Sequence, residues 1–186
     1  MRFILTISFI ILNYFGYAQS NPQIKEAYVY LNKIRQNPNL YTKDIGINLS
    51  GIASRPNLLW NDTLASVAQK KAEDMVKRSY FGHTDPDGNG INILILREGF
   101  TIPEEWTIPK SNNYFESLSA GNVTPKEGII YLIKDGGVVS HKEAGHRNHL
   151  LGIEKFYANL TDIGIGWATG GKYGTYMCVI IAKHQW

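Results

Sequence analysis

The sequence has one cysteine, little charge and no apolar run long enough to span a membrane. Cys178 is the only cysteine among 186 residues, so no internal disulfide can form and the fold depends on its core. Charged residues make up 19% of the chain and apolar residues 44%, a composition that excludes a disordered protein. Lys and Arg outnumber Asp and Glu by only 19 to 16 and are scattered, so no nucleic-acid partner is expected.

The first eighteen residues have the pattern of a secretory signal peptide. Arg2 supplies a positive start, an apolar run follows from Phe3 to Leu12, and Gly16-Tyr17-Ala18 puts small residues at a cleavage site. The rival interpretation is a membrane anchor, but a transmembrane helix needs about 20 apolar residues and this run is shorter. We therefore expect residues 1–18 to be removed, no transmembrane anchor, and export to the periplasm or secretion.

Residues 19–186 contain no repeat, low-complexity tract or long linker, and we expect one domain. Apolar residues at helical spacing predict helices over 24–34, 62–80 and 91–98. A fourth helix should start at Thr124-Pro125-Lys126-Glu127, because a threonine cap, a first-turn proline and a following glutamate form a capping box. It should end at Asp135-Gly136-Gly137.

The C-terminal part of the chain predicts a β-hairpin. Apolar runs over 163–168 and 175–182 flank a glycine-rich turn, and Cys178 lies in the second run as a small buried hydrophobe. Residues 40–58 are expected to be irregular. Helices before, between and over the strands predict an α/β fold, a three-layer α-β-α sandwich with a mostly antiparallel central sheet.

Histidines are the first candidates for function. His83 opens a loop rich in turn-forming residues, and His141, His146 and His149 fall within nine residues, together with Glu143. Imidazole is a common metal ligand and acid–base group, but a loop histidine can equally serve as a hydrogen-bond partner within the fold. No His-Glu-x-x-His, Gly-x-Ser-x-Gly or phosphate-binding glycine loop is present, so the pattern alone leaves the chemistry open.

Several segments, taken in order, have the pattern of one known family. They are Leu31–Arg35, Leu59–Leu64, Tyr80–Gly88, Phe115–Gly121, Asp135–Val138 with Gly145–Leu151, Ile163–Ala168 and Tyr173–Ala182. In this order they resemble the CAP superfamily of cysteine-rich secretory, antigen 5 and pathogenesis-related proteins, and in particular its secreted bacterial branch (SCP domain). The resemblance covers about residues 24–183 of the chain.

The resemblance implies an α-β-α sandwich with a cleft lined by two histidines and two acidic residues. By motif these are His83, Glu116 and His146, with Asp135 as the better match for the second acid and Glu143 as its competitor. His149 and His141 are secondary candidates. The sequence departs from the family in that Phe115 and Ser117 replace the usual Gly and Asn beside the acid, which leaves the pose of Glu116 open.

Two imidazoles with one or two carboxylates form a borderline site for Zn²⁺ or, with water, a looser site for Mg²⁺ or Ca²⁺. His83 and His146 are the expected ligands, with Glu116 as the acidic neighbour that both rings share. Beyond such a divalent cation, we expect no required cofactor. The sequence supplies no conventional triad, so catalytic residues stay unassigned.

The leading hypothesis is therefore a non-enzymatic ligand-binding module whose cleft holds a divalent cation. The resemblance implies lipids, sterols or glycans as ligand classes. One alternative is a metal-dependent hydrolase acting on peptide or cell-envelope material, and another is a structural or interaction domain with a vestigial cleft. The sequence does not set the oligomeric state.

The signal-peptide interpretation can be checked on the exported protein. Expression of the full chain in a secreting bacterial host should give a protein that begins at Gln19, as read from its intact mass. Replacing Ala18 by Arg should block cleavage, because a large charged residue then stands at the position that requires a small one. Replacing Gln19 by Ser should leave cleavage unchanged. A wild-type protein that keeps residues 1–18 after export would contradict this interpretation.

Overall fold

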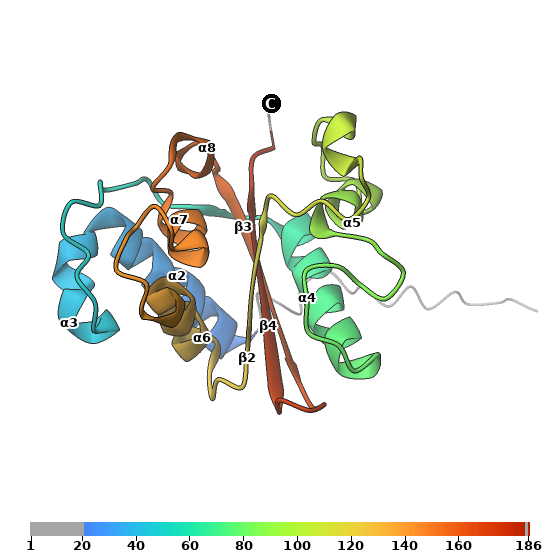
Figure 1. Cartoon of the computed structure of the whole chain (residues 1–186), viewed down its shortest axis with the longest axis horizontal. Coiled ribbons are helices and arrows are strands. Elements are labelled where there is room, and N and C mark those ends of the chain that lie inside the picture. The colour runs from blue at the N-terminus through green and yellow to red at the C-terminus, as the bar shows by residue number, and fades with distance from the viewer. Residues whose placement is uncertain (1–20, 185) are drawn as a thin grey trace, which may run out of the picture.

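A computed structural model describes residues 21–184 and 186, so the expected signal peptide lies outside the described residues. The chain forms a four-stranded sheet with helices on both faces (Figure 1). The strands are β1 (Leu59–Trp60), β2 (Glu116–Ala120), β3 (Asp162–Thr169) and β4 (Thr175–Ala182). The α-helices are α2 (Pro22–Gln36), α3 (Thr42–Ile45), α4 (Asp62–Lys77), α5 (Ile91–Arg97), α6 (Pro125–Lys134), α7 (Gly145–Leu151) and α8 (Lys155–Ala158). Three short 3₁₀ segments are η1 (Pro38–Tyr41), η2 (Glu104–Thr107) and η3 (Asp135–Gly137).

The sheet has the strand order β1-β3-β4-β2, which makes β2 an edge strand. Strands β3 and β4 form the antiparallel hairpin that the sequence predicts, and β2 pairs antiparallel with β4. Only the two-residue strand β1 runs parallel, beside β3. The sheet is therefore mostly antiparallel, as predicted.

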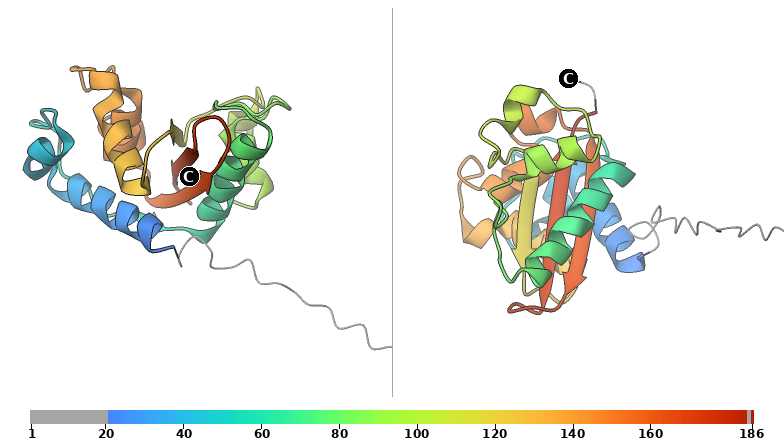
Figure 2. Two further views of the ribbon diagram at one scale, coloured as in Figure 1. Left: turned by 90° about the horizontal axis from the view of Figure 1, so that it is seen from below. Right: turned by 90° about the vertical axis from the view of Figure 1, so that its right-hand side faces the viewer.

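Helices cover the two faces of the sheet and complete a three-layer sandwich. Helices α2, α3, α6 and α7 lie on one side, and α4 and α5 lie on the other (Figures 1 and 2). The core between the layers is apolar, and strand β4 is buried along nearly its whole length, including Cys178. Among the described residues, no helix combines the length and the apolar character needed to cross a membrane.

The helix starts follow the capping signals in the sequence. Asn61 accepts a hydrogen bond from the backbone N–H of Leu64 at the start of α4, and Thr124 accepts one from Glu127 at the start of α6. The Glu127 carboxylate returns to the backbone N–H of Val123, one residue before the cap. Helix α6 ends at Lys134, and the next residue, Asp135, is its C-cap and has a left-handed backbone conformation.

Helix α4 lies unusually close to β3 because two strand residues have no side chain. A Cβ atom on Gly166 would lie 2.2 Å from the backbone of Ala68, and one on Gly164 would lie 2.2 Å from the backbone of Leu64. Real Cβ atoms do not approach other atoms this closely, so both positions require glycine. This contact fixes α4 on the sheet and sets the position of the loop that follows it, which carries His83.

The structure differs from the sequence prediction in several short elements. Residues 40–58, expected to be irregular, contain the end of η1 and all of α3. Strand β2 and helix α8 have five and four residues, too few for hydrophobic periodicity to reveal them. The seven-residue helix α7 has its two leucines side by side at its end, so it shows no helical spacing either. These elements nevertheless carry or border the candidate site.

The close contact between α4 and β3 generates a stability prediction. Replacing Gly166 by Ala should lower the free energy of unfolding by at least about 2 kcal/mol, because the added methyl group overlaps the α4 backbone. Urea titration measures this change. Gly145→Ala is the matched control, because nothing lies within 4 Å of its Cβ position, and it should change stability by no more than about 0.5 kcal/mol. Equal effects of the two substitutions would refute the close-packing argument.

Candidate functional site

A pocket of about 230 Å³ lies beside the edge strand β2 and brings together most of the predicted residues. Successive side chains of a strand point to opposite faces of its sheet. Glu116 therefore points to the α4 side and contacts Cys178, whereas Ser117 points to the other side and contacts His149 of α7. The pocket spans both sides and is lined by His83, Asn113, Tyr114, Glu116, Ser117, Asp135, Gly145, His146, His149 and Tyr157.

His83 and Glu116 form the first imidazole–carboxylate pair. His83 Nδ1 lies 2.8 Å from Glu116 Oε2, and the ring is partly exposed while the carboxylate is fully buried. The Cys178 thiol donates to the other carboxylate oxygen, with Sγ 3.3 Å from Oε1. Burial is the main cause that raises the pKa of Cys178, and Glu116 adds to it, so the thiol stays neutral and acts as a donor. Both oxygens of Glu116 therefore have partners.

Asn113 packs beside the His83–Glu116 pair at the free edge of strand β2. Its Oδ1 accepts the backbone N–H of Glu116 at 3.0 Å, which fixes the amide, and its Nδ2 lies 2.8 Å from His83 Nδ1. One ring nitrogen thus faces both a carboxylate and an amide N–H. A charged acceptor gives the stronger hydrogen bond, so a proton on Nδ1 points to Glu116 and Asn113 packs against the pair.

His146 and Asp135 form the second pair, on the other side of β2. His146 Nδ1 lies 2.7 Å from Asp135 Oδ1, and Asp135 Oδ2 accepts the backbone N–H groups of His146 and Arg147. Asp135 therefore caps the first turn of α7 while it holds the His146 ring. The positive φ of 49° at Asp135 turns the chain at the end of α6 and brings this carboxylate to α7.

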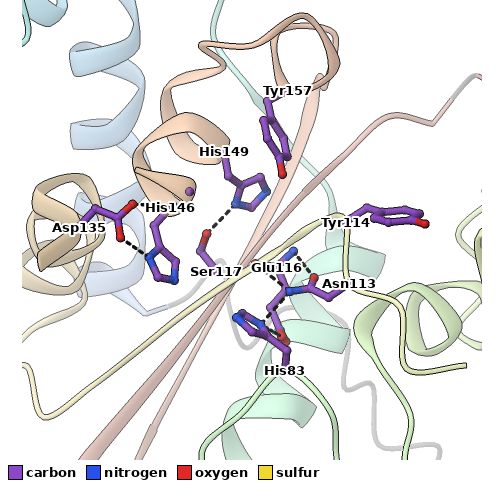
Figure 3. A pocket seen from close by; sticks show the side chains of 10 residues that line it. His83, Asn113, Tyr114, Glu116, Ser117, Asp135, His146, His149 and Tyr157 are labelled. Carbon is purple, nitrogen blue, oxygen red and sulfur yellow. Dashed lines mark hydrogen bonds and ion pairs between the residues drawn. The ribbon is translucent and has the colours of Figure 1, made fainter. Parts of the chain in front are cut away.

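The two pairs face each other across the pocket. Figure 3 shows the His83–Glu116 pair on one wall and the His146–Asp135 pair on the other, with the second ring nitrogen of each histidine turned toward the space between them. Because each Nδ1 is used by a carboxylate, each Nε2 is the nitrogen available to a ligand. The site therefore offers two oriented imidazoles from opposite layers of the sandwich.

His149 forms a third, different arrangement at the inner wall. Only 3% of His149 is exposed, and its Nδ1 lies 2.7 Å from Ser117 Oγ. No side chain or backbone group makes a hydrogen bond of ordinary geometry to its Nε2 among the described residues. Burial lowers the pKa of His149 to about 3, so the ring is neutral at physiological pH. Tyr157 packs edge-on against it.

The remaining candidates lie outside the pocket. Glu143, the competitor for the second acidic position, is exposed and does not line the pocket, so Asp135 is the acid beside His146. His141 accepts a hydrogen bond from the buried Arg147 guanidinium instead. The expectation that both histidines share Glu116 is wrong. Each ring has its own carboxylate, because the rings lie on opposite sides of the edge strand.

Sequence reasoning missed Asn113 and the Ser117–His149 pair. Asn113 lies in a loop where asparagine is common, and no spacing rule connects it to His83. Ser117 stands out in the sequence only as a departure from the family pattern. In a strand at 116–120, Ser117 and Glu116 would point to opposite faces of the sheet. A segment this short cannot be predicted as a strand from its pattern, however.

The described residues provide few protein ligands for a metal ion. Within residues 21–184 and 186, no group of three or more His, Cys, Asp or Glu side chains is arranged to hold one. The two carboxylates are already engaged with the Nδ1 atoms. A cation in this pocket would therefore take two ring nitrogens from the protein and its remaining ligands from water or a bound molecule.

The neutral, buried state of His149 predicts a pH dependence of stability. The unfolded chain binds a proton at a pKa of about 6.5 and the folded chain at about 3, so the unfolded state takes up more protons between these values. The stabilisation is complete above about pH 6.5 and is lost as pH falls, by up to about 1.4 kcal/mol per pH unit. Urea titrations between about pH 7 and 5 should show this slope relative to His149→Asn, which cannot titrate. Parallel pH profiles for the two proteins would contradict the assignment.

One of the solved structures most similar to this chain supports the same fold. An outer surface protein of Borrelia burgdorferi superimposes with a TM-score of 0.55 at 16% identity, over 88% of this chain and 93% of that chain. An extracellular SCP-domain protein of Bacillus anthracis is 19% identical, with a TM-score of 0.48 over 88% of this chain and 44% of that chain. Venom allergen-like protein 4 of Schistosoma mansoni is 16% identical, with a TM-score of 0.48 over 87% of this chain and 88% of that chain. No curated protein sequence matches significantly.

The sequence itself matches a family profile over most of its length. The profile describes the CAP, or cysteine-rich secretory protein, family and aligns with residues 30–181. This range contains both histidine–carboxylate pairs, the glycines that seat α4 on β3, and the closing hairpin. The chain therefore belongs to the CAP family.

Proposed function

We propose that this CAP domain is an exported binding module whose pocket holds a divalent cation between His83 and His146. One observation carries the proposal. Each of the two rings is held at Nδ1 by its own carboxylate, at 2.8 and 2.7 Å, while the second nitrogen of each ring faces the same pocket (Figure 3).

Carboxylate-anchored imidazoles are the usual form of histidine at metal sites. Hydrogen bonding at one ring nitrogen fixes the tautomer and the orientation of the ring and makes the other nitrogen a better ligand. Glu116 would act in this way on His83 and Asp135 on His146. Asp135 is itself held by the start of α7, and Glu116 by the Cys178 thiol, so neither carboxylate is free to move into the pocket.

Zn²⁺ is the cation that this donor set favours. Imidazole nitrogen suits Zn²⁺, whereas Mg²⁺ and Ca²⁺ prefer oxygen ligands. With two protein ligands, the other coordination positions would go to water or to oxygen atoms of a bound molecule. The cation would thus connect a small polar ligand to the protein, and the affinity of the protein alone for the cation should be modest.

Binding is favoured over catalysis because the nucleophile candidates near the pocket are poorly prepared for reaction. Ser117 is buried, and its partner His149 has a pKa of about 3, too low for an effective general base near neutral pH. The Cys178 thiol is buried with a raised pKa, which disfavours the reactive thiolate. The site is therefore suited to holding a ligand.

Export follows from the signal-peptide pattern of residues 1–18. By their names, the Borrelia protein is an outer surface protein and the Bacillus protein is extracellular, which supports the same location for this chain. The lipid, sterol and glycan classes implied by the family remain candidates for the molecule that completes the site.

Zinc titration of the mature protein tests the proposal. Isothermal calorimetry should show one Zn²⁺ per chain, and His83→Ala or His146→Ala should weaken binding by at least about 100-fold, because each removes a direct ligand. Glu116→Gln and Asp135→Asn should each weaken binding about 10- to 100-fold, because they remove the group that orients a ring.

His184→Ala is the matched control for these variants. His184 Nδ1 lies 2.7 Å from Asp162 Oδ2 in a pair of the same kind, but His184 does not line the pocket, so its loss should leave zinc binding unchanged. Equal zinc binding by wild type, His83→Ala and His146→Ala would refute the cation site. Zinc-dependent turnover of peptide or peptidoglycan substrates would favour the hydrolase instead.

A further inference from the structure

Lys71 is a buried lysine of helix α4. Only 2% of it is exposed, although lysine is almost never this buried without an ionic partner. Among the described residues, no carboxylate lies within 4.0 Å of its ammonium group. Burying an unpaired charge is unfavourable for folding, so its presence at this position calls for a reason other than stability.

The two partners of the Lys71 ammonium belong to the segment that leads into the pocket. Nζ donates to the backbone carbonyl of His83 at 3.2 Å and lies 4.9 Å from the centre of the Tyr80 ring. The Tyr80 hydroxyl in turn donates to Asp74 of α4 at 2.8 Å, which fixes the ring. The ammonium therefore ties the backbone of His83 to helix α4, which is itself seated on β3.

The charge of Lys71 also reaches the Cys178 thiol, which donates to the buried Glu116 carboxylate. The pKa of the Cys178 thiol is raised by burial and then by Glu116, whereas Lys71 acts in the opposite direction. Lys71 lies on α4, and Glu116 and Cys178 point to the α4 side of the sheet, so all three side chains belong to the same layer. Lys71 therefore contacts the loop that carries His83. Its charge also acts on the Cys178 thiol, which hydrogen-bonds to Glu116.

We propose that Lys71 is a positioning residue of the pocket, which sets the place of the His83 ring by holding the His83 backbone. The proposal rests on the proposed function of His83 as a ligand of the site. It makes one distinctive claim: the charge serves binding and does not serve stability. A neutral side chain of similar length should therefore leave the fold intact and weaken the site.

The test compares Lys71→Met with Lys70→Met. Methionine has a similar length and suits a buried position, but it cannot donate to the His83 carbonyl. Lys70 is the neighbouring residue on α4, and its ammonium group is exposed and paired with Glu98, so its replacement is the matched control. Three quantities are measured: the thermal unfolding midpoint, the zinc affinity, and the ring ¹H–¹⁵N signals of His83 and His146 in the metal-free protein.

Lys71→Met should unfold at or above the wild-type temperature and bind zinc about 10- to 100-fold more weakly, as expected when a group that orients a ligand is lost. Its His83 ring signals should shift, while those of His146 stay in place. Lys70→Met should match the wild type in zinc affinity and in both sets of ring signals.

Unchanged His83 signals and zinc affinity in Lys71→Met would overturn the proposal. A lower unfolding midpoint with shifts at both histidines would also overturn it, because Lys71 would then be a structural residue. The metal-free signals separate this proposal from the proposed function. If wild type binds no zinc but Lys71→Met shifts His83 alone, the cation site fails and the positioning role of Lys71 stands.

Discussion

The site depends on the alternation of side chains along the edge strand β2. Glu116 and Ser117 are neighbours in the chain but point into different layers, where they meet His83 and His149. The register of β2 against β4 fixes this choice, with Glu116 opposite Ile180 and Ser117 opposite Val179. A slip by one residue would exchange the two faces and separate both side chains from their partners. The chemistry of the pocket therefore follows from strand pairing in the core.

The two walls of the pocket each orient a histidine ring with a carboxylate, but they do so with different local structure. On the α4 side, the carboxylate belongs to Glu116 of strand β2, and its partner His83 lies in the loop after α4. The contact of Lys71 with the His83 backbone and the close packing of α4 on β3 hold this loop in place. On the other side, the carboxylate of Asp135 ends one helix and caps the next, which presents His146. Both arrangements leave an oriented imidazole with one nitrogen free, and neither depends on a disulfide.

Much of the fold could be predicted from the sequence because its signals are local. The caps at Asn61 and Thr124, the apolar stripes of α2 and α4, and the glycine-rich turn of the final hairpin each act within a few residues. The pairing of His83 with Glu116 and of His146 with Asp135 depends on strand register and on a left-handed residue, which local patterns do not encode. The expectation of one shared acid failed for this reason.

The buried stripe of α4 contains one charged residue. Leu64, Ala68 and Met75 mark the buried stripe of α4, and Lys71 falls on the same stripe, three residues after Ala68 and four before Met75. A charged residue on the buried face of a helix indicates that a polar group of another segment packs against it, here the His83 carbonyl. By contrast, nothing in the sequence connects Ser117 with His149 or Asn113 with His83, because these contacts join segments that are distant along the chain.

The position of the histidines in two different layers has a mechanical consequence. A chain without disulfides has no covalent cross-link between the helices on the two faces of its sheet, which are joined only through the backbone. A species that binds both His83 and His146 would add a reversible link between those layers, present when that species is abundant and absent when it is scarce. The free energy of unfolding would then depend on the concentration of that species around the protein, since mass action couples occupancy of the pocket to the stability of the fold.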